Sequence, residues 1–154
     1  MNMPKPTPEH QKLHAFVGTW KGEEKLFPSN WDPTGGPAYG VFTHRMEING
    51  FFLITDYVET RNGQESYRGH GIMGYDANKK VYTWYWVDAM GMPPSHPIEG
   101  HWTDKGLLFN ESGPKGHFSH GFGLLDPNTS TFRIDTSADG KTWSPMMEGR
   151  YVKQ

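Results

Sequence analysis

The chain has 154 residues, a formal net charge of −2 and no cysteine, with 14% aromatic residues, 19 glycines and 12 prolines. This length suits a single domain, the near-neutral charge argues against non-specific nucleic-acid binding, and the lack of cysteine excludes disulfides and thiolate chemistry. No apolar run approaches the roughly 18 residues that span a bilayer, and the N-terminus lacks the apolar segment of a signal peptide. We therefore expect a cytoplasmic protein that binds neither membrane nor nucleic acid.

The N-terminal segment predicts a flexible tail followed by a short helix. Residues 1–7 are rich in proline, and the domain is expected to cover residues 8–154. Thr7-Pro8-Glu9 places an N-cap hydroxyl before proline at the first helical position and an acid in the first turn. One or two helical turns are predicted through about Ala15, and no other substantial helix is expected.

The rest of the chain alternates strand patterns with turn signals, which is typical of an all-β fold. Asn49-Gly50, Asn62-Gly63 and Asp139-Gly140 are hairpin signals. Strands are predicted at Thr19–Phe27, Tyr39–Glu47, Phe51–Thr60, Glu65–Tyr75, Val81–Val87, Ile98–Thr103, Leu107–Asn110, His117–Leu125, Thr131–Ser137 and Trp143–Val152. Ten antiparallel strands in meander order favour one closed β-barrel, because closure removes exposed edges. The longer, proline-rich connections at residues 28–38 and 89–97 are predicted to be rim loops.

The stretch FVGTWKGEEKLF contains a Gly-x-Trp motif, Gly18-Thr19-Trp20, directly after the predicted helix. In this position the motif resembles the opening of the calycins, which include the lipocalins and the fatty-acid-binding proteins. The resemblance implies that Trp20 closes one end of the barrel, with a basic residue of the last strand over its ring. The matching residue is Arg150, and a guanidinium on an indole is favourable by about 0.5–2 kcal/mol.

Further segments extend the resemblance over almost the whole chain. FVGTWKGEEKLF, WDPTGGPA, INGFFLITDY, SYRGHGIMGYD, WYWVDAMGMPP and MEGRY are similar to a bacterial domain-of-unknown-function family, number 1579, which has no established activity. A looser resemblance to nitrobindin-type barrels implies haem as a possible cofactor. Those barrels take their axial histidine from near the C-terminus, whereas no histidine follows His120 here, which disfavours haem.

Strand alternation assigns side chains to the inside or outside of the predicted barrel. If Trp20 points inward, so does Glu24. A tight Asn62-Gly63 turn would pair Thr55 with His70 and Tyr57 with Arg68, which favours Arg68 and His70 inside. A β-bulge would instead turn Gly69, Gly71 and Met73 inward. Trp84 and Trp86 are placed inside with His70, and the facing of Glu99 stays open.

These placements predict a small-molecule binding barrel whose ligand is mostly apolar, aromatic or acidic. The candidate binding residues are Glu24, Arg68, His70, Trp84, Trp86 and Glu99. The two tryptophans would stack on the ligand, Arg68 and His70 would hold an anionic or carbonyl group, and Glu24 would orient Arg68. The structural alternative is a filled core with one buried ion pair between Glu24 and Arg68.

Other readings of the sequence stay open. An isomerase or cyclase could use His70 as general acid or base, although the chain has no cysteine and no Gly-x-Ser-x-Gly nucleophile. An interaction module could use Trp31 and Met90–Met92 at the rims, and an exposed aromatic and methionine patch would mark it. No metal is expected, since His117 and His120 are three residues apart and point to opposite faces of a strand. The sequence is also compatible with a homodimer.

Overall fold

The structure, a computed structural model, describes residues 1–154 and begins with a short helix at the predicted place. Helix α1 (Pro8–Lys12) continues into one 3₁₀ turn, η1 (Leu13–Phe16). The backbone N–H of Thr7 donates a hydrogen bond to Nδ1 of His10, 3.1 Å away, which fastens the first turn. Neither helical segment has the length and apolar character needed to cross a membrane.

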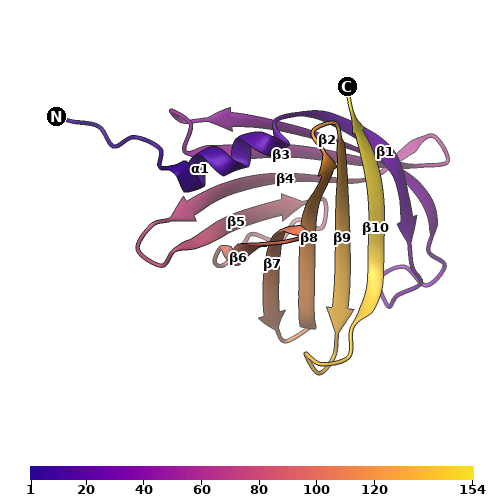
Figure 1. The fold of residues 1–154 in the computed structure, drawn as a ribbon. Coiled ribbons are helices and arrows are strands. Elements are labelled where there is room, and N and C mark those ends of the chain that lie inside the picture. Colours follow the sequence, from indigo (N-terminus) through magenta and orange to yellow (C-terminus); the bar gives the residue numbers. More distant parts are fainter.

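Ten antiparallel strands follow and form a closed barrel, as predicted (Figure 1). Each strand pairs with the next, and β1 also pairs with β10, so every edge is covered. The strands are β1 (Gly18–Leu26), β2 (Gly36–Glu47), β3 (Phe52–Arg61), β4 (Gln64–Asp76), β5 (Val81–Asp88), β6 (Ile98–Thr103), β7 (Gly106–Gly113), β8 (Gly116–Asp126), β9 (Thr129–Ser137) and β10 (Ser144–Lys153). Because β2 begins three residues earlier than predicted, the first rim loop is residues 27–35, here called the β1–β2 loop.

Trp20 lies at the end of the barrel that the N-terminal helix covers. Its side chain is 1% exposed, and its indole N–H donates a 2.8 Å hydrogen bond to the carbonyl oxygen of Phe16. The ring therefore buries a large apolar area while its polar atom is satisfied by the segment that leads into β1. Leu13 and Phe16 pack in the same core cluster. This arrangement explains why a short helix precedes the Gly-x-Trp motif.

The basic side chain that lies over the Trp20 ring is that of Lys153, not that of Arg150 as the calycin resemblance implied. The Nζ atom of Lys153 lies 5.6 Å from the centre of the Trp20 ring. The β1–β10 register pairs Trp20 with Lys153 and pairs the outward-facing Glu23 with Arg150. Paired residues share a face of the sheet, so Arg150 projects into solvent.

The prediction that Arg68 and His70 point inward is wrong. The β3–β4 register shifts between Glu59 and Thr60, because Ser66 is an additional residue on β4 with no partner on β3. As a result Tyr57 pairs with Gly69 rather than with Arg68, and every β4 residue beyond the bulge faces the side opposite to that predicted. A hydrogen bond stabilises the bulge: the Ser66 hydroxyl donates to Oε1 of Glu59 at 2.7 Å.

Aromatic side chains fill most of the barrel interior. A small cavity of about 10 Å³ lies among rings that include Phe42, Phe122, Phe132 and Tyr151. Such a space holds about one water molecule. Because side chains fill the interior, any ligand that enters the barrel must displace side chains or part of a loop.

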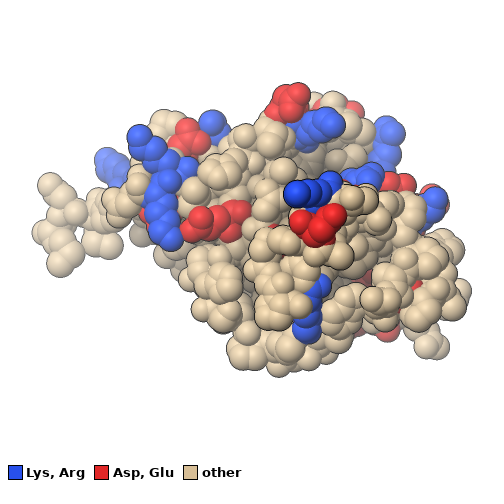
Figure 2. Space-filling view, turned by 90° about the horizontal axis from the view of Figure 1, so that it is seen from below, with Lys and Arg blue, Asp and Glu red and all other residues tan.

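Seen from below, the outer surface carries scattered charges of both signs between larger uncharged areas (Figure 2).

Candidate ligand-binding site

Three of the predicted binding residues lie on the outer surface, each in polar contact with a neighbouring charged side chain. The Arg68 guanidinium is 2.8 Å from a Glu65 carboxylate oxygen. Nδ1 of His70 is 2.7 Å from Oδ1 of Asp56. Glu99 forms a 3.0 Å pair with Lys79, because the β5–β6 register turns its neighbour Gly100 inward instead. None of the three contributes to the barrel interior.

Trp84 and Trp86 point into the barrel and form one wall of it. Trp84 is 3% exposed, Trp86 is half-buried, and their ring centres are 5.3 Å apart. The ring of Trp86 lies against Gly69, where a Cβ atom would overlap it. Its indole N–H donates to the hydroxyl of Tyr67 at 3.1 Å. The inward glycine of β4 thus makes room for a tryptophan of β5.

Substituting Gly69 by alanine tests this packing. The added methyl group must displace the Trp86 ring, so we expect unfolding to become easier by about 1–3 kcal/mol, with a changed near-UV circular dichroism spectrum. Gly113→Ala is the matched control, because a Cβ atom there meets nothing within 4 Å. Urea titrations of both variants measure the difference. Equal effects of the two substitutions would contradict the proposed contact.

Glu24 lies inside the barrel as predicted, but it binds tyrosines instead of Arg68. Its carboxylate accepts hydrogen bonds from the hydroxyls of Tyr57, at 2.8 Å, and of Tyr151, at 2.7 Å. The side chain is 4% exposed, and burial raises its pKa from the ordinary value near 4.5 to about 7, although the two hydroxyls work in the opposite direction. Close to neutral pH this carboxyl group can therefore either hold or release a proton.

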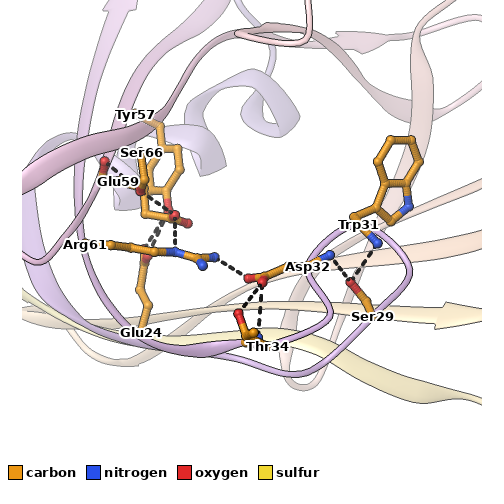
Figure 3. Close-up of polar contacts among 10 residues, drawn as sticks. Glu24, Ser29, Trp31, Asp32, Thr34, Tyr57, Glu59, Arg61 and Ser66 are labelled. Atoms are coloured by element: carbon orange, nitrogen blue, oxygen red, sulfur yellow. Dashed lines mark hydrogen bonds and ion pairs between the residues drawn. The ribbon is translucent and has the colours of Figure 1, made fainter.

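A second buried carboxyl group, Glu59, links Glu24 to the rim (Figure 3). Tyr57 joins the two acids, since its hydroxyl also lies 3.4 Å from Oε2 of Glu59. The guanidinium of Arg61 is 3.2 Å from Glu59 and 2.7 Å from Asp32 of the β1–β2 loop. A continuous polar chain thus runs from the interior to this loop. The sequence reasoning placed Tyr57 on the inward face but did not name Tyr57, Glu59 or Arg61 as site residues, although alternation along β3 puts all three on one face.

The β1–β2 loop reaches over part of the barrel opening. Lys115, in the β7–β8 turn, places its Nζ 4.8 Å from the centre of the Trp31 ring, although β10 and β9 separate β1 from β8. Asp32 also stabilises the loop from within, by accepting a 3.1 Å hydrogen bond from the Gly35 N–H. The loop is therefore attached at Arg61 on one side and at Lys115 on the other.

On the opposite interior wall, three side chains have buried nitrogen atoms without a hydrogen-bond partner. They are the indole nitrogens of Trp84 and Trp102 and both ring nitrogens of His120. The rings of Trp84 and His120 meet edge to face, with centres 5.1 Å apart. Nε2 of His120 is 3.8 Å from Glu111, an ion-pair distance too long for a hydrogen bond, and His120 holds the pKa of that carboxyl below its ordinary value.

The interior residues do not fit a haem group. His120 is the inward histidine with unpartnered ring nitrogens, but its ring packs edge to face on Trp84 and beside Phe118, so neither nitrogen is presented to an open face where a haem iron could lie. No three His, Asp or Glu side chains lie close enough together to hold a metal ion. The chemistry available inside the barrel is therefore that of aromatic rings, hydroxyls and protonatable carboxyl groups.

Two solved structures share the fold over nearly the whole chain. Rv2717c from M. tuberculosis is 11% identical with a TM-score of 0.72, and the match covers 96% of this chain and 98% of that one. The S-type phycobiliprotein lyase CPES from Guillardia theta is 7% identical with a TM-score of 0.67, covering 96% and 93%. A search of curated protein sequences finds no match.

The family comparison agrees with the sequence resemblance. A family described as "Protein of unknown function (DUF1579)" matches residues 5–153, so the match includes the helix, all ten strands and both long rim loops. The chain belongs to this family, DUF1579.

Proposed function

We propose that the barrel binds a small, mostly apolar aromatic molecule between the wall of Trp84 and Trp86 and the wall of Tyr57 and Glu24. Ligand sites of this kind combine apolar walls with a few converging polar groups. Arg68 and His70, the two basic residues from which an acidic ligand was predicted, lie on the outside and do not line this site. The aromatic character of the ligand remains supported by the exposed part of Trp86.

The observation that carries the proposal is the unpartnered indole nitrogen of Trp84, together with the ring nitrogens of His120. A buried polar atom without a hydrogen bond costs about 1–3 kcal/mol, so proteins seldom retain one without a use for it. A ligand with a hydrogen-bond acceptor would satisfy Trp84 and regain that free energy. The same wall is aromatic, so the ligand would be held by stacking as well.

Entry to the site would pass the β1–β2 loop. The interior is filled while the loop is attached at Arg61 and Lys115, so binding requires the loop to move or the half-buried Trp86 to turn. Loops that close a barrel or cleft commonly move on binding. Movement of the loop would break the contacts of Asp32 with Arg61 and of Trp31 with Lys115.

The neutral probe N-phenyl-1-naphthylamine tests the proposal. We expect saturable fluorescence enhancement with one molecule bound per chain, weakened about tenfold in Trp86→Ala through loss of stacking. Tyr85→Ala is the matched control, because Tyr85 is the neighbouring aromatic residue on the outer face and is 43% exposed. Absence of saturable binding, or equal weakening in both variants, would overturn the proposal.

Proton-transfer catalysis inside the barrel is a second candidate, favoured by the pKa of Glu24 near 7. A group that titrates at the working pH is suited to act as general acid or base. The phycobiliprotein lyase CPES, which has the same fold, is named as an enzyme, so a barrel of this fold is compatible with catalysis. The earlier candidate, His70, is outside the barrel and cannot act there. If Glu24 acts as acid or base, the protein should turn over a substrate at a rate that changes around pH 7. A protein that only binds its ligand shows no turnover at any pH.

A further inference from the structure

A cleft lies on the outside of the barrel, over strands β7, β8 and β9, which are neighbours in the sheet (Figure 1). Its volume is about 330 Å³, at the lower end of the range for small-molecule sites. Five residues line it: Leu108, Asn110, Ser119, Asp135 and Trp143. Because the sheet separates this cleft from the barrel interior, a ligand bound here is independent of the interior ligand proposed above.

The strand residues of the cleft form a row across the sheet. Asn110 pairs with Ser119, and Ser119 pairs with Asp135. Paired residues point to the same side, so an amide, a hydroxyl and a carboxylate are adjacent on the outer face. In the next row Leu108 pairs with Gly121, where an added Cβ atom would meet only the Leu108 side chain, at 3.7 Å. The missing side chain at Gly121 keeps the floor of the cleft low.

Trp143 gives the cleft an aromatic wall in a fixed position. It ends the β9–β10 turn (residues 138–143) and is 42% exposed. Oδ1 of Asp139 accepts hydrogen bonds from the backbone N–H groups of Lys141 and Thr142, both at 2.8 Å, directly before Trp143. The indole shares the cleft with Leu108 although β8 lies between β7 and β9, so it extends across the sheet. A wall that is already held in place adds little ordering cost when a ligand binds.

The carboxylate of Asp135 is held in place as well. Nε of Arg133 donates to both of its oxygens, at 3.0 and 2.8 Å, and the same guanidinium is 3.3 Å from Glu148. The positive charge beside the cleft on β9 is thus paired within the protein. An anionic ligand would therefore meet the Asp135 carboxylate without a free cation to balance it.

We propose that this cleft binds a neutral sugar unit of a saccharide. A pyranose ring has C–H groups on its faces, which pack on an aromatic ring, and hydroxyl groups around its rim. Trp143 would contact the face of the ring. The Asp135 carboxylate would accept from hydroxyl groups in charge-assisted hydrogen bonds, and the Asn110 amide would both donate and accept. A purely apolar ligand would remove water from these polar groups without replacing its hydrogen bonds.

Titrations followed by two-dimensional NMR of the isotope-labelled protein test the proposal, with the methyl β-glycosides of glucose, galactose and N-acetylglucosamine as probes. At least one glycoside should shift the indole N–H signal of Trp143 in a saturable way. The dissociation constant should be on the order of 1 mM, as one stacked ring and a few hydrogen bonds allow. Glucose 6-phosphate and glucuronic acid should bind more weakly than the glucoside, because Asp135 repels them.

Variants assign the binding to the cleft, with the backbone N–H signal of Ser119 as the probe. Trp143→Ala should weaken binding of the glycoside about tenfold through loss of the stacked ring. Gly121→Val should also weaken it, because this variant narrows the cleft and removes no contact. Asp135→Asn should reduce the disadvantage of the charged sugars. Trp31→Ala is the matched control, since Trp31 is 55% exposed but lies on the β1–β2 loop, and it should leave the affinity unchanged.

Three results would overturn the proposal. They are the absence of a saturable shift with all three glycosides, equal weakening in Trp31→Ala and Trp143→Ala, and tighter binding of the charged sugars than of the neutral ones. Binding of N-phenyl-1-naphthylamine should be the same in Trp143→Ala as in the unmodified protein, because this cleft is outside the barrel. Failure of the sugar site and failure of the interior ligand site are therefore separate results.

Discussion

Trp20→Ala is expected to lower the free energy of unfolding by about 4 kcal/mol, the typical cost of removing a large buried aromatic side chain. Trp20 is 1% exposed and packs with Leu13, Phe16 and Phe42 at the closed end of the barrel. Its loss leaves a space that the surrounding strands cannot close, and it leaves the Phe16 carbonyl without its 2.8 Å donor. Urea unfolding at pH 7, followed by circular dichroism, measures the change.

Two further variants make this expectation specific. Trp20→Phe keeps a ring but loses the N–H and part of the volume, so its effect should be intermediate. Trp143→Ala removes a tryptophan that is 42% exposed and should change the free energy by less than about 1 kcal/mol. A similar loss of stability in Trp20→Ala and Trp143→Ala would show that the plug at the closed end is not a main source of stability.

Glu24→Gln is expected to become more stable relative to the unmodified protein as the pH rises. Burial raises the pKa of Glu24 from 4.5 to about 7, so the folded chain binds more protons than the unfolded chain between these values. Its free energy of unfolding therefore falls with rising pH across this window, by about 3 kcal/mol in total. Glutamine does not ionise, so the free energy of unfolding of the variant does not undergo this decrease.

His44 has the opposite pH dependence and conceals that of Glu24 in the unmodified protein. It is buried at the closed end, with Nδ1 at 2.8 Å from the Thr55 hydroxyl, and burial lowers its pKa from 6.5 to about 4. Here the unfolded chain binds more protons, so stability rises between pH 4 and pH 6.5. The two contributions nearly cancel in this window. Removing Glu24 exposes the His44 contribution.

The measurement is the difference in unfolding free energy between Glu24→Gln and the unmodified protein at pH 4.5, 6 and 8. Because both proteins share all other titrating groups, the difference isolates Glu24, and it should shift by about 3 kcal/mol in favour of the variant from pH 4.5 to pH 8. Glu23→Gln, on the outer face of the same strand, should show a constant difference. A constant difference for Glu24→Gln as well would mean that Glu24 titrates as an exposed carboxyl group does.

Much of the architecture follows from local patterns. Asn62 and Gly63 both have positive φ angles, 52° and 77°, as the hairpin signal between two strand patterns predicts. Each element was recognisable because its signal lies within a few neighbouring residues, and the meander order then left closure as the way to cover the edges. The inward facing of Glu24 also followed, since no bulge separates it from Trp20 on β1.

The site was harder to predict, because facing depends on register. Ser66 is one additional residue on β4, and it alone reverses Arg68 and His70 relative to the simple alternation. Similarly, the place of Lys153 over Trp20 depends on how β10 pairs with β1, more than a hundred positions earlier in the chain. No short stretch of sequence contains either fact.

Local sequence patterns were therefore enough to predict the all-β meander, the turns, the helical entry to β1 and the aromatic interior face of β5. They could not predict which polar residues meet inside the barrel, namely Glu24 and Glu59 with Tyr57, Tyr151 and Arg61. This difference follows from the range of the interactions. Backbone and turn preferences act over a few residues, whereas the register between strands is set by packing and hydrogen bonds between distant segments, and one inserted residue exchanges the two faces of a strand.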